Sequence, residues 1–271
     1  MATLVTGTGT ENHRVVSAVE WVTQRKELLK KEKEFTRLRD ELSRERRQLP
    51  WERVEKNYVF DGPHGKETLA DLFAGRSQLI IYHFMFGPDW EQGCPSCSLI
   101  ADGFDGTLIH LANRDVTLAA VSRAPIEKIE AFRKRMGWQF HWVSSFQNSF
   151  NFDYHVSFTK EEIASGKVYY NYTMQGFPSD EAPGGSAFYK SEQNEIFHTY
   201  SSFQRGLDIN INTYNFLDIA PKGRNEEELP FAMAWVRHHD RYDQKYFVDP
   251  KTEDTGPNAA GSSCCSGENH S

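Results

Sequence analysis

The sequence predicts an α/β domain with a central mixed sheet flanked by helices. Two apolar β-type runs, residues 79–86 and 116–122, are each followed by a stretch with helical character. The order strand, helix, strand, helix implies parallel strands joined by right-handed crossovers. Two later strands, residues 186–190 and 196–200, are joined across a short polar turn and add an antiparallel pair to the sheet.

The composition restricts the class of protein. At 271 residues the chain can bury one elaborated domain of about 200 residues plus an accessory element. The net charge of −7 argues against a nucleic-acid-binding surface. No stretch approaches the roughly 18 apolar residues of a membrane span, and the first residues lack the layout of a secretory signal. We therefore expect a cytoplasmic protein with neither a nucleic-acid nor a membrane partner.

Residues 14–50 follow a flexible N-terminus, residues 1–13, and have the pattern of an amphipathic helix that Pro50 ends. Its apolar residues fall seven apart, at Leu28, Phe35, Leu42 and Leu49. The charges around them have both signs, as on the solvated face of a long helix. We expect the apolar row to dock on the rest of this chain or on a second copy. A homodimer through this helix is therefore one expected arrangement.

Residues 51–248 form the predicted main domain, a sheet elaborated by helical and aromatic insertions. Its other expected elements are strands at 58–60 and 140–143 and helices at 68–73, from the CxxC to about 112, and at 126–136, 203–217 and 231–243. Gly103 and Gly106 indicate close packing of their helix against a strand. The aromatic-rich residues 138–177 are expected to form a subsidiary core, and the polar residues 249–271 a disordered Gly/Ser/Cys tail.

The sequence Cys94-Pro95-Ser96-Cys97 follows the first apolar strand and opens a helix. This layout is typical of thioredoxin-like redox proteins, so we expect a thioredoxin-like fold. With Pro95 in the first helical turn, the positive end of the helix would lower the pKa of Cys94 below its free value of about 8.5. Cys97 lies on the same helix face. Cys94 is then the nucleophile that attacks a disulfide, and Cys97 is the resolving thiol.

Three residues elsewhere are candidates for supporting this dithiol. Trp90 lies in the loop before it. Arg123 ends the 116–122 strand, at the edge where open sheets place ligands. There it either steadies a thiolate or an anionic substrate, or makes an ordinary salt bridge. Pro183 precedes the 186–190 strand, and we expect a cis peptide bond there because thioredoxin folds place a cis-proline before this strand, against the CxxC.

A metal centre is the main alternative use of the same thiols. Copper(I) or zinc would suit Cys94 and Cys97 with a histidine, for which His83 and His198 are candidates. However, a zinc site needs four ligands and the chain has no second CxxC, and His83 also fits a hydrogen-bonded core histidine. Other metal-capable residues, without diagnostic spacing, are His238, His239 and Asp240.

The predicted tail carries a second cysteine pair, Cys264 and Cys265. A vicinal pair on a flexible arm could exchange disulfides with the Cys94–Cys97 pair or bind a soft metal ion. The alternative is an incidental tail sequence, which so short a match in a polar segment favours.

With these residues in order, residues 16–243 resemble domain-of-unknown-function family 899, a thioredoxin-like group often labelled dithiol-disulfide isomerase. The resemblance rests on the segments RKELLKKEKEFTRLRDELSRERRQLP, YHFMFGPDWEQGCPSCS, ADGFDG, LAAVSRAPIEKIEAFRKRMGW, FHTYSSFQRGLDI and MAWVRHHDRYD. It implies a thioredoxin fold wrapped in extra helices, with the site at Cys94 and Cys97. The cysteine pair of the tail is not part of the family pattern.

The leading hypothesis is an oxidoreductase that needs no cofactor and acts on a disulfide-containing protein or a small-molecule thiol or disulfide. A thiol peroxidase of the peroxiredoxin type is a neighbouring alternative, but it would show Pro, three residues, Thr or Ser, two residues, then Cys. Here Pro88 precedes Cys94 by six residues, and Glu91 stands three before it. A third hypothesis is a non-catalytic interaction module that dimerises through the N-terminal helix.

Overall fold

A computed structural model describes residues 13–242 of the chain. The chain divides into two compact units, residues up to Pro50 and residues from Trp51 onward. The tail cysteines, Cys264 and Cys265, lie outside the described residues.

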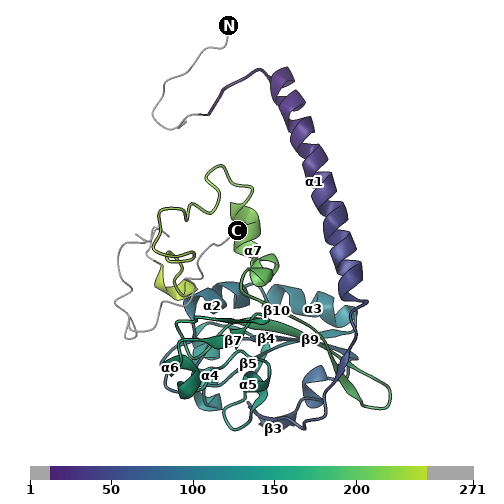
Figure 1. The fold of residues 1–271 in the computed structure, drawn as a ribbon, viewed down its shortest axis with the longest axis vertical. Coiled ribbons are helices and arrows are strands. Elements are labelled where there is room, and N and C mark those ends of the chain that lie inside the picture. The colour runs from purple at the N-terminus through teal and green to yellow at the C-terminus, as the bar shows by residue number, and fades with distance from the viewer. Residues whose placement is uncertain (1–12, 243–271) are drawn as a thin grey trace. The chain divides into compact units, whose positions relative to one another are not determined.

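The first unit contains one long helix, α1 (Ala18–Arg46), drawn in purple in Figure 1. The Ser17 side chain caps it by accepting a hydrogen bond from the Glu20 N–H at 3.2 Å, so the helix begins four residues later than predicted. No residue of α1 is buried, and the predicted apolar row is exposed, with Phe35 66% accessible. Among the described helices, none combines the length and the apolar character that a membrane span requires.

The second unit is built on an eight-stranded mixed sheet in the order β1-β10-β9-β4-β5-β6-β2-β3. Its strands are β1 (Glu52–Arg53), β2 (Val59–Gly62), β3 (Gly65–Thr68), β4 (Gln78–His83), β5 (Val116–Ser122), β6 (His141–Ser144), β9 (Gly184–Lys190) and β10 (Ile196–Phe203). The strands β4, β5 and β6 run parallel, while β9 pairs antiparallel with both β4 and β10. This arrangement, with the CxxC leaving β4, is a thioredoxin-like fold and confirms the predicted fold class.

The helices of this unit are short. They are α2 (Pro95–Ala101), α3 (Asp105–Asn113), α4 (Ile126–Arg135), α5 (Phe150–Asp153), α6 (Lys160–Ala164) and α7 (Asn212–Leu217), with 3₁₀ turns at Asp71–Phe73, Gln204–Asn210 and His239–Arg241. The helix α4 matches its predicted limits because Pro125 fixes its start, and Gly137 takes the left-handed φ of +71° that follows its end.

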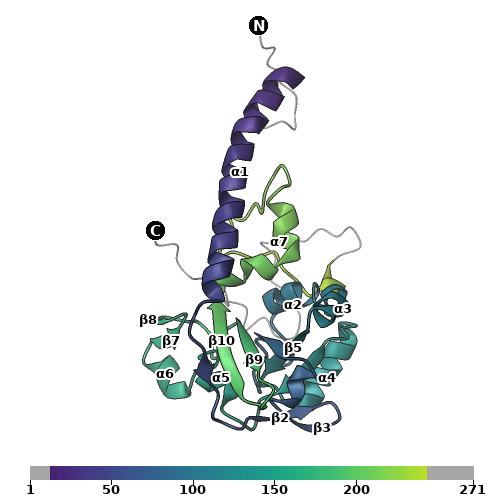
Figure 2. The ribbon, with the colours of Figure 1, turned by 90° about the vertical axis from the view of Figure 1, so that its right-hand side faces the viewer.

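Side chains of β4 alternate between two cores. Leu79 and Ile81 pack with Phe150 of α5 on one face of the sheet. Tyr82 belongs to the other core, which also contains both cysteines and residues of α2, α4 and α7. In Figures 1 and 2, α2, α3 and α7 lie together on one side of the sheet and α5 lies on the other. The CxxC is thus part of the core that contains Tyr82 and not of the core that contains Leu79 and Ile81.

The helix predicted after the CxxC is not continuous, so this prediction is wrong. It breaks into α2 and α3 around Gly103, where a Cβ atom would lie 2.9 Å from the Asn212 side-chain nitrogen. Gly103 therefore allows close approach of the first residue of α7, not of a strand. At Gly106 a Cβ would meet nothing within 4 Å, so this glycine has no packing role.

Three other predicted helices are also shorter or absent. Residues 68–73 form the end of β3 and a 3₁₀ turn, because Asp71 Oδ2 accepts hydrogen bonds from the Thr68 N–H at 2.8 Å and hydroxyl at 2.7 Å. Residues 203–217 form a 3₁₀ turn before α7. Residues 231–242 are almost entirely non-helical, because their side chains bond to other parts of the chain, as described below.

The aromatic-rich stretch contributes a subsidiary core, as predicted. It includes α5, α6 and a separate hairpin of β7 (Val168–Tyr170) and β8 (Thr173–Gln175). The buried residues of this core are Val156, Phe158, Val168, Tyr170, Ala182 and Phe203.

Candidate active site

The two cysteines of the CxxC lie where the end of β4 passes into α2. The Cys94 N–H donates to the Met85 carbonyl at 3.0 Å, which returns the intervening loop to the end of the strand. The Cys94 carbonyl accepts from both the N–H and the hydroxyl of Ser98, at 3.0 and 2.9 Å. Pro95 occupies the first helical position, where its missing N–H leaves no donor unsatisfied. Backbone bonds therefore fix both cysteines at the start of α2.

Both thiols are buried, with Cys94 3% and Cys97 2% accessible, and neither is in a disulfide. The pKa of Cys97 is raised well above its usual value, first by burial and then by its hydrogen bond to Cys94 and the charge there. The Tyr82 hydroxyl and the backbone at Met85 act in the opposite direction. The dithiol is therefore asymmetric: Cys97 holds its proton and Cys94 is the sulfur toward which that proton is directed.

Tyr82 lies beside Cys97 in the same core and is 3% accessible. Its ring packs edge-on against Phe104, with the ring centroids 5.4 Å apart. Its hydroxyl influences the pKa of Cys97 but makes no hydrogen bond of normal length and angle in this dithiol state. Burial raises the pKa of Tyr82 well above 10, and the neighbouring Cys97 adds to the shift. The phenol is therefore a protonated donor next to the thiols.

His238 covers the dithiol from the C-terminal side and is itself buried. Its Nε2 lies 2.8 Å from the Gly93 carbonyl oxygen and its Nδ1 lies 3.3 Å from the Arg135 guanidinium. Because a carbonyl only accepts and a guanidinium only donates, Nε2 carries the proton and the ring is neutral. Burial lowers the pKa of His238, whereas a charge on Cys94 would raise it. His238 therefore both anchors the residue before Cys94 and senses the charge of its thiol.

Residues 231–242, which we call the C-terminal cover, are held by a further ion pair and by a further side-chain hydrogen bond. Arg135 of α4 binds Asp240 through Nε and a terminal nitrogen, both at 2.8 Å, and this hydrogen bonding lowers the pKa of Asp240. His239 Nδ1 lies 2.7 Å from Asp102 Oδ1, just after α2. Side-chain contacts to α2 and α4 thus fix a segment that has almost no helical structure of its own.

Trp90 packs against the same core from the loop before the cysteines. A Cβ atom at Gly87 would lie 2.8 Å from the indole nitrogen of Trp90, so the glycine makes room for this ring. Lys128 of α4 donates to the carbonyls of Pro88 and Trp90, at 3.2 and 3.0 Å. Trp90 thus helps to shape the loop that carries the dithiol.

Arg123 forms a buried ion pair and not a contact with the thiols. It lies 2.9 Å from Glu181 Oε1, and the Ser157 hydroxyl donates to the other oxygen of that carboxylate at 2.6 Å. Burial raises the pKa of Glu181 to about 8, against the effect of Arg123. Of the two roles considered for Arg123, the structure shows the salt bridge.

The predicted cis peptide bond at Pro183 is wrong, because the described residues contain no cis peptide bond. The Tyr170 hydroxyl donates to the Pro183 carbonyl at 2.6 Å, and the Ala182 N–H donates to the Val156 carbonyl at 2.8 Å. These two hydrogen bonds hold the chain just before β9, where the peptide bond at Pro183 is trans.

His83 and His198 lie in a separate hydrogen-bonded column on the opposite face of β4 from Tyr82. His83 Nε2 is 2.8 Å from the Ser186 hydroxyl, which is 2.8 Å from the Ser201 hydroxyl, which is 2.7 Å from His198 Nε2. Burial lowers the pKa of His83 to about 3, and its Nδ1 has no hydrogen-bond partner. Glu52 approaches His198 Nδ1 at 3.4 Å.

This column bears on the metal alternative. Within residues 13–242, no three side chains of His, Cys, Asp or Glu come together as a group that could hold a metal ion. His83 is bonded to Ser186 and does not join the cysteines.

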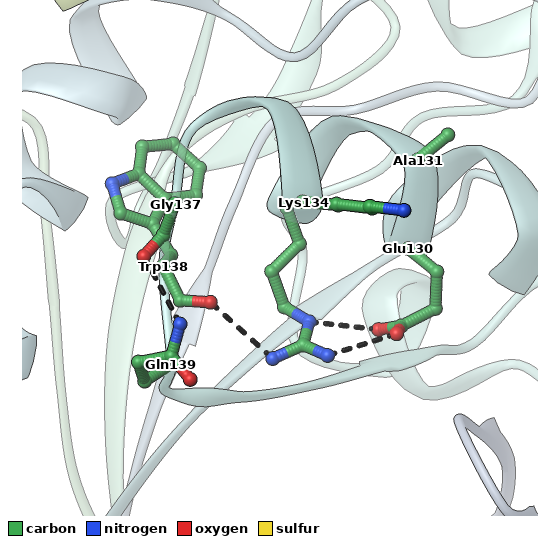
Figure 3. Close-up of a pocket in the computed structure, with 7 residues that line it drawn as sticks. Glu130, Ala131, Lys134, Gly137, Trp138 and Gln139 are labelled. Atoms are coloured by element: carbon green, nitrogen blue, oxygen red, sulfur yellow. Dashed lines mark hydrogen bonds and ion pairs between the residues drawn. The ribbon is translucent and has the colours of Figure 1, made fainter.

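A surface hollow of about 400 Å³ lies at the C-terminal end of α4 (Figure 3). Its lining residues are Glu130, Ala131, Arg133, Lys134, Gly137, Trp138 and Gln139. The guanidinium of Arg133 is already bonded to both oxygens of Glu130 at 2.9 Å and to the Trp138 carbonyl at 3.3 Å. None of the lining residues is a cysteine, so this hollow is separate from the dithiol.

Residues 10–242 match the model of the family described as bacterial protein of unknown function, DUF899. The chain belongs to this family. The resemblance seen in the sequence is thereby confirmed for most of the chain. No curated protein matches the sequence of this DUF899 chain.

Several solved structures resemble this DUF899 chain at low identity. Peroxiredoxin Q from Xanthomonas campestris is 14% identical over 56% of this chain and 84% of that chain, with a TM-score of 0.41. The peroxidoxin BcpB from Mycobacterium tuberculosis is 11% identical over 60% and 94%, with a TM-score of 0.40. A hypothetical protein from Sinorhizobium meliloti 1021 is 14% identical over 55% and 68%, with a TM-score of 0.34.

Sequence reasoning missed two residues of the site in this DUF899 chain. In the sequence Tyr82 resembles an ordinary aromatic core residue. Its role becomes visible only when the alternation along β4 places Tyr82 and His83 on opposite faces of the sheet. His238 was recognised only as a metal-capable residue, and its contact with Gly93 spans 145 positions. Neither role follows from a local motif.

Proposed function

We propose that this protein is a thiol–disulfide oxidoreductase in which Cys94 is the nucleophile and Cys97 the resolving thiol. The observation that carries the proposal is the reduced dithiol at the start of α2, in which Cys97 is hydrogen-bonded to Cys94. Their spacing along one helix places both sulfurs within reach of each other, as disulfide exchange requires. A thiol redox role needs no cofactor.

The exchange proceeds in two balanced steps. The Cys94 thiolate attacks a substrate disulfide, forming a mixed disulfide and releasing one substrate sulfur as a thiolate. Cys97 then attacks Cys94 Sγ, and the second substrate sulfur leaves with the proton of Cys97. The substrate disulfide is reduced to two thiols and the Cys94–Cys97 pair is oxidised to a disulfide. The reverse sequence oxidises a dithiol.

Burial of both sulfurs restricts the substrate. A sulfur atom can reach Cys94, which is 3% accessible, only when the surrounding side chains move. The substrate class we propose is a disulfide-containing protein or a small-molecule disulfide that enters after the C-terminal cover moves away from Gly93.

The test is the redox state of Cys94 and Cys97 across a series of dithiol buffers, read by alkylation and mass spectrometry. The chain carries Cys264→Ser and Cys265→Ser, so that only the CxxC can respond. A single two-electron transition between roughly −120 and −270 mV supports the proposal. The absence of a Cys94–Cys97 disulfide throughout that range contradicts it.

The same sample separates the alternatives. Thiols that resist alkylation until a chelator is added would support copper or zinc binding instead. Oxidation that is much faster with a hydroperoxide than with a disulfide, with a sulfenic acid intermediate on one cysteine, would support a thiol peroxidase. The variant Cys97→Ser is the matched control, because a disulfide oxidoreductase then stops at the mixed disulfide on Cys94.

A further inference from the structure

Within residues 13–242 the Tyr82 hydroxyl makes no hydrogen bond of ordinary length and angle, and the group with which it interacts is the Cys97 thiol. A buried hydroxyl without a partner costs free energy, because it has lost its hydrogen bonds to water. The ring cannot turn its hydroxyl away, since it is packed edge-on against Phe84 and Phe104 with ring centroids 6.1 and 5.4 Å apart. An unpaired donor is therefore held beside the thiols, in contact with the core that contains them.

Cys97, in turn, requires a hydrogen-bond donor that stabilises its thiolate. To resolve a mixed disulfide it must become nucleophilic, yet burial and its hydrogen bond to Cys94 hold its pKa well above the usual value. Two groups of the described residues favour its thiolate, the Tyr82 hydroxyl and the backbone at Met85. Once Cys94 is in a mixed disulfide, its sulfur is no longer a thiolate. Cys97 then has no charged sulfur at Cys94 to which it can donate its hydrogen bond.

We propose that Tyr82 donates a hydrogen bond to Cys97 Sγ as that sulfur attacks the mixed disulfide on Cys94. This inference rests on the proposed function and assigns a residue to its second step. The Cys97–Cys94 bond forms while the bond from Cys94 Sγ to the substrate sulfur breaks. The proton of Cys97 goes to the departing sulfur, and Tyr82 keeps its own proton throughout.

Other titratable groups near these residues do not replace Tyr82. Tyr170 interacts with Tyr82 electrostatically, but its hydroxyl is bonded to the Pro183 carbonyl at 2.6 Å. His238 lies on the Cys94 side and its Nε2 proton is bonded to the Gly93 carbonyl. Among these side chains of residues 13–242, Tyr82 is then the donor beside Cys97, and it acts together with the backbone at Met85.

The test uses Tyr82→Phe, which removes the hydroxyl and retains the ring, in a chain with Cys264→Ser and Cys265→Ser. The probe is 5,5′-dithiobis(2-nitrobenzoate), whose two thiolates are released in sequence. The first release reports attack by Cys94 and the second reports resolution by Cys97. We expect the first rate to stay within about twofold and the second to fall about tenfold, with its pH profile moved upward by about one unit. An unchanged second rate and profile would overturn the proposal.

Tyr214→Phe is the matched control, because this buried tyrosine belongs to the same core but bonds to Glu226 at 2.8 Å. It should leave both rates unchanged. If it slows the second release as much as Tyr82→Phe does, the effect is one of packing and the proposal is wrong.

A second measurement keeps the two proposals apart. In Cys94→Ser chains the pH dependence of Cys97 alkylation gives the pKa of that thiol without any exchange reaction. Tyr82→Phe should raise this pKa by about one unit. If wild type shows no second release but this shift is found, the oxidoreductase proposal fails while the contact between Tyr82 and Cys97 stands. If the shift is absent, the role of Tyr82 is overturned.

Discussion

His238 Nε2 lies 2.8 Å from the carbonyl oxygen of Gly93, which places the C-terminal cover directly on the residue before Cys94. The bond joins two segments 145 positions apart, and burial lowers the pKa of the same imidazole. Access to the dithiol is therefore linked to the anchoring of a non-helical segment.

His238→Ala should make Cys94 more accessible. Loss of the bond to Gly93, with the smaller side chain, should raise the rate of Cys94 alkylation by iodoacetamide about fivefold, since a buried hydrogen bond contributes about 1 kcal/mol. The measurement is mass spectrometry of the Cys94 peptide over time. His239→Ala is the comparison, because it removes an exposed side-chain contact with Asp102 at 2.7 Å and should change the rate less than twofold. Equal rates in wild type and His238→Ala would show that the cover does not control access.

The buried pair of Arg123 and Glu181 should be important for stability and not for exchange. Arg123→Met leaves the Glu181 carboxyl, 1% accessible, without its cationic partner although Ser157 still donates to it, and should lower the free energy of unfolding by about 3 kcal/mol. Lys30→Met, which removes an exposed pair with Glu27 on α1, should change it by less than about 0.5 kcal/mol. Urea unfolding measures both. A change in the first thiolate release from the aromatic disulfide with little loss of stability would instead assign Arg123 to the thiols.

His83 should make stability depend on acidity. Its pKa is near 3 in the folded chain and about 6.5 when unfolded. Between these values the unfolded chain binds more protons, so stability falls as pH decreases from 6.5 toward 3, by up to about 1.4 kcal/mol per pH unit. Above pH 6.5 this contribution is constant.

The check on His83 is urea unfolding at several pH values for wild type and His83→Gln. The difference between the two curves should show this slope, and a difference independent of pH would contradict the assignment. Taking the difference is necessary because Glu181 acts in the opposite sense. Its pKa of about 8 in the folded chain lies above the usual 4.5, so its contribution to stability is lost as pH rises from 4.5 through 8.

The exposed apolar row of α1 leads us to predict parallel pairing with a second copy of this chain. If the row occupies the a positions of a heptad, opposite charges face each other between parallel helices at Glu20–Arg25, Glu34–Arg39 and Glu41–Arg46, and like charges face each other at Glu27–Glu32. Antiparallel pairing would instead place glutamates against glutamates.

This pairing is tested on the full chain by light scattering over a range of concentrations. Phe35→Lys combined with Leu42→Lys should give a monomer wherever wild type is a dimer. Lys33→Glu, on the opposite side of the helix from the apolar row, is the control and should not alter the mass. A wild-type chain that is monomeric up to about 1 mM would rule out the prediction.

Local patterns were sufficient for some parts of the molecule. The strands β4 and β5 and the helix α4 could be predicted because apolar runs and the punctuation by Pro125 and Gly137 act over a few residues. Cys94 and Pro95 were placed correctly at a helix start for the same reason. These features depend on neighbours in the chain and not on the tertiary fold.

The remaining features depend on contacts between distant segments. The break after α2 is set by Asn212 against Gly103, and residues 231–242 are held outside a helix by Arg135 and by the Gly93 carbonyl. No periodicity encodes such contacts. The expected cis bond at Pro183 was transferred from a general fold, whereas the bond from the Tyr170 hydroxyl is particular to this chain.

The hydrogen bonds that join His83, Ser186, Ser201 and His198 all donate in the same direction along the column. Each serine hydroxyl has a single hydrogen, so if it donates to one neighbour it must accept from the other. When His198 donates from Nε2, each hydroxyl passes its hydrogen onward and His83 must accept at Nε2, which puts its own proton on the unpartnered Nδ1. Reversing one link reverses all of them. Whether His198 donates or accepts at Nε2 therefore selects the tautomer of His83, an imidazole in the core.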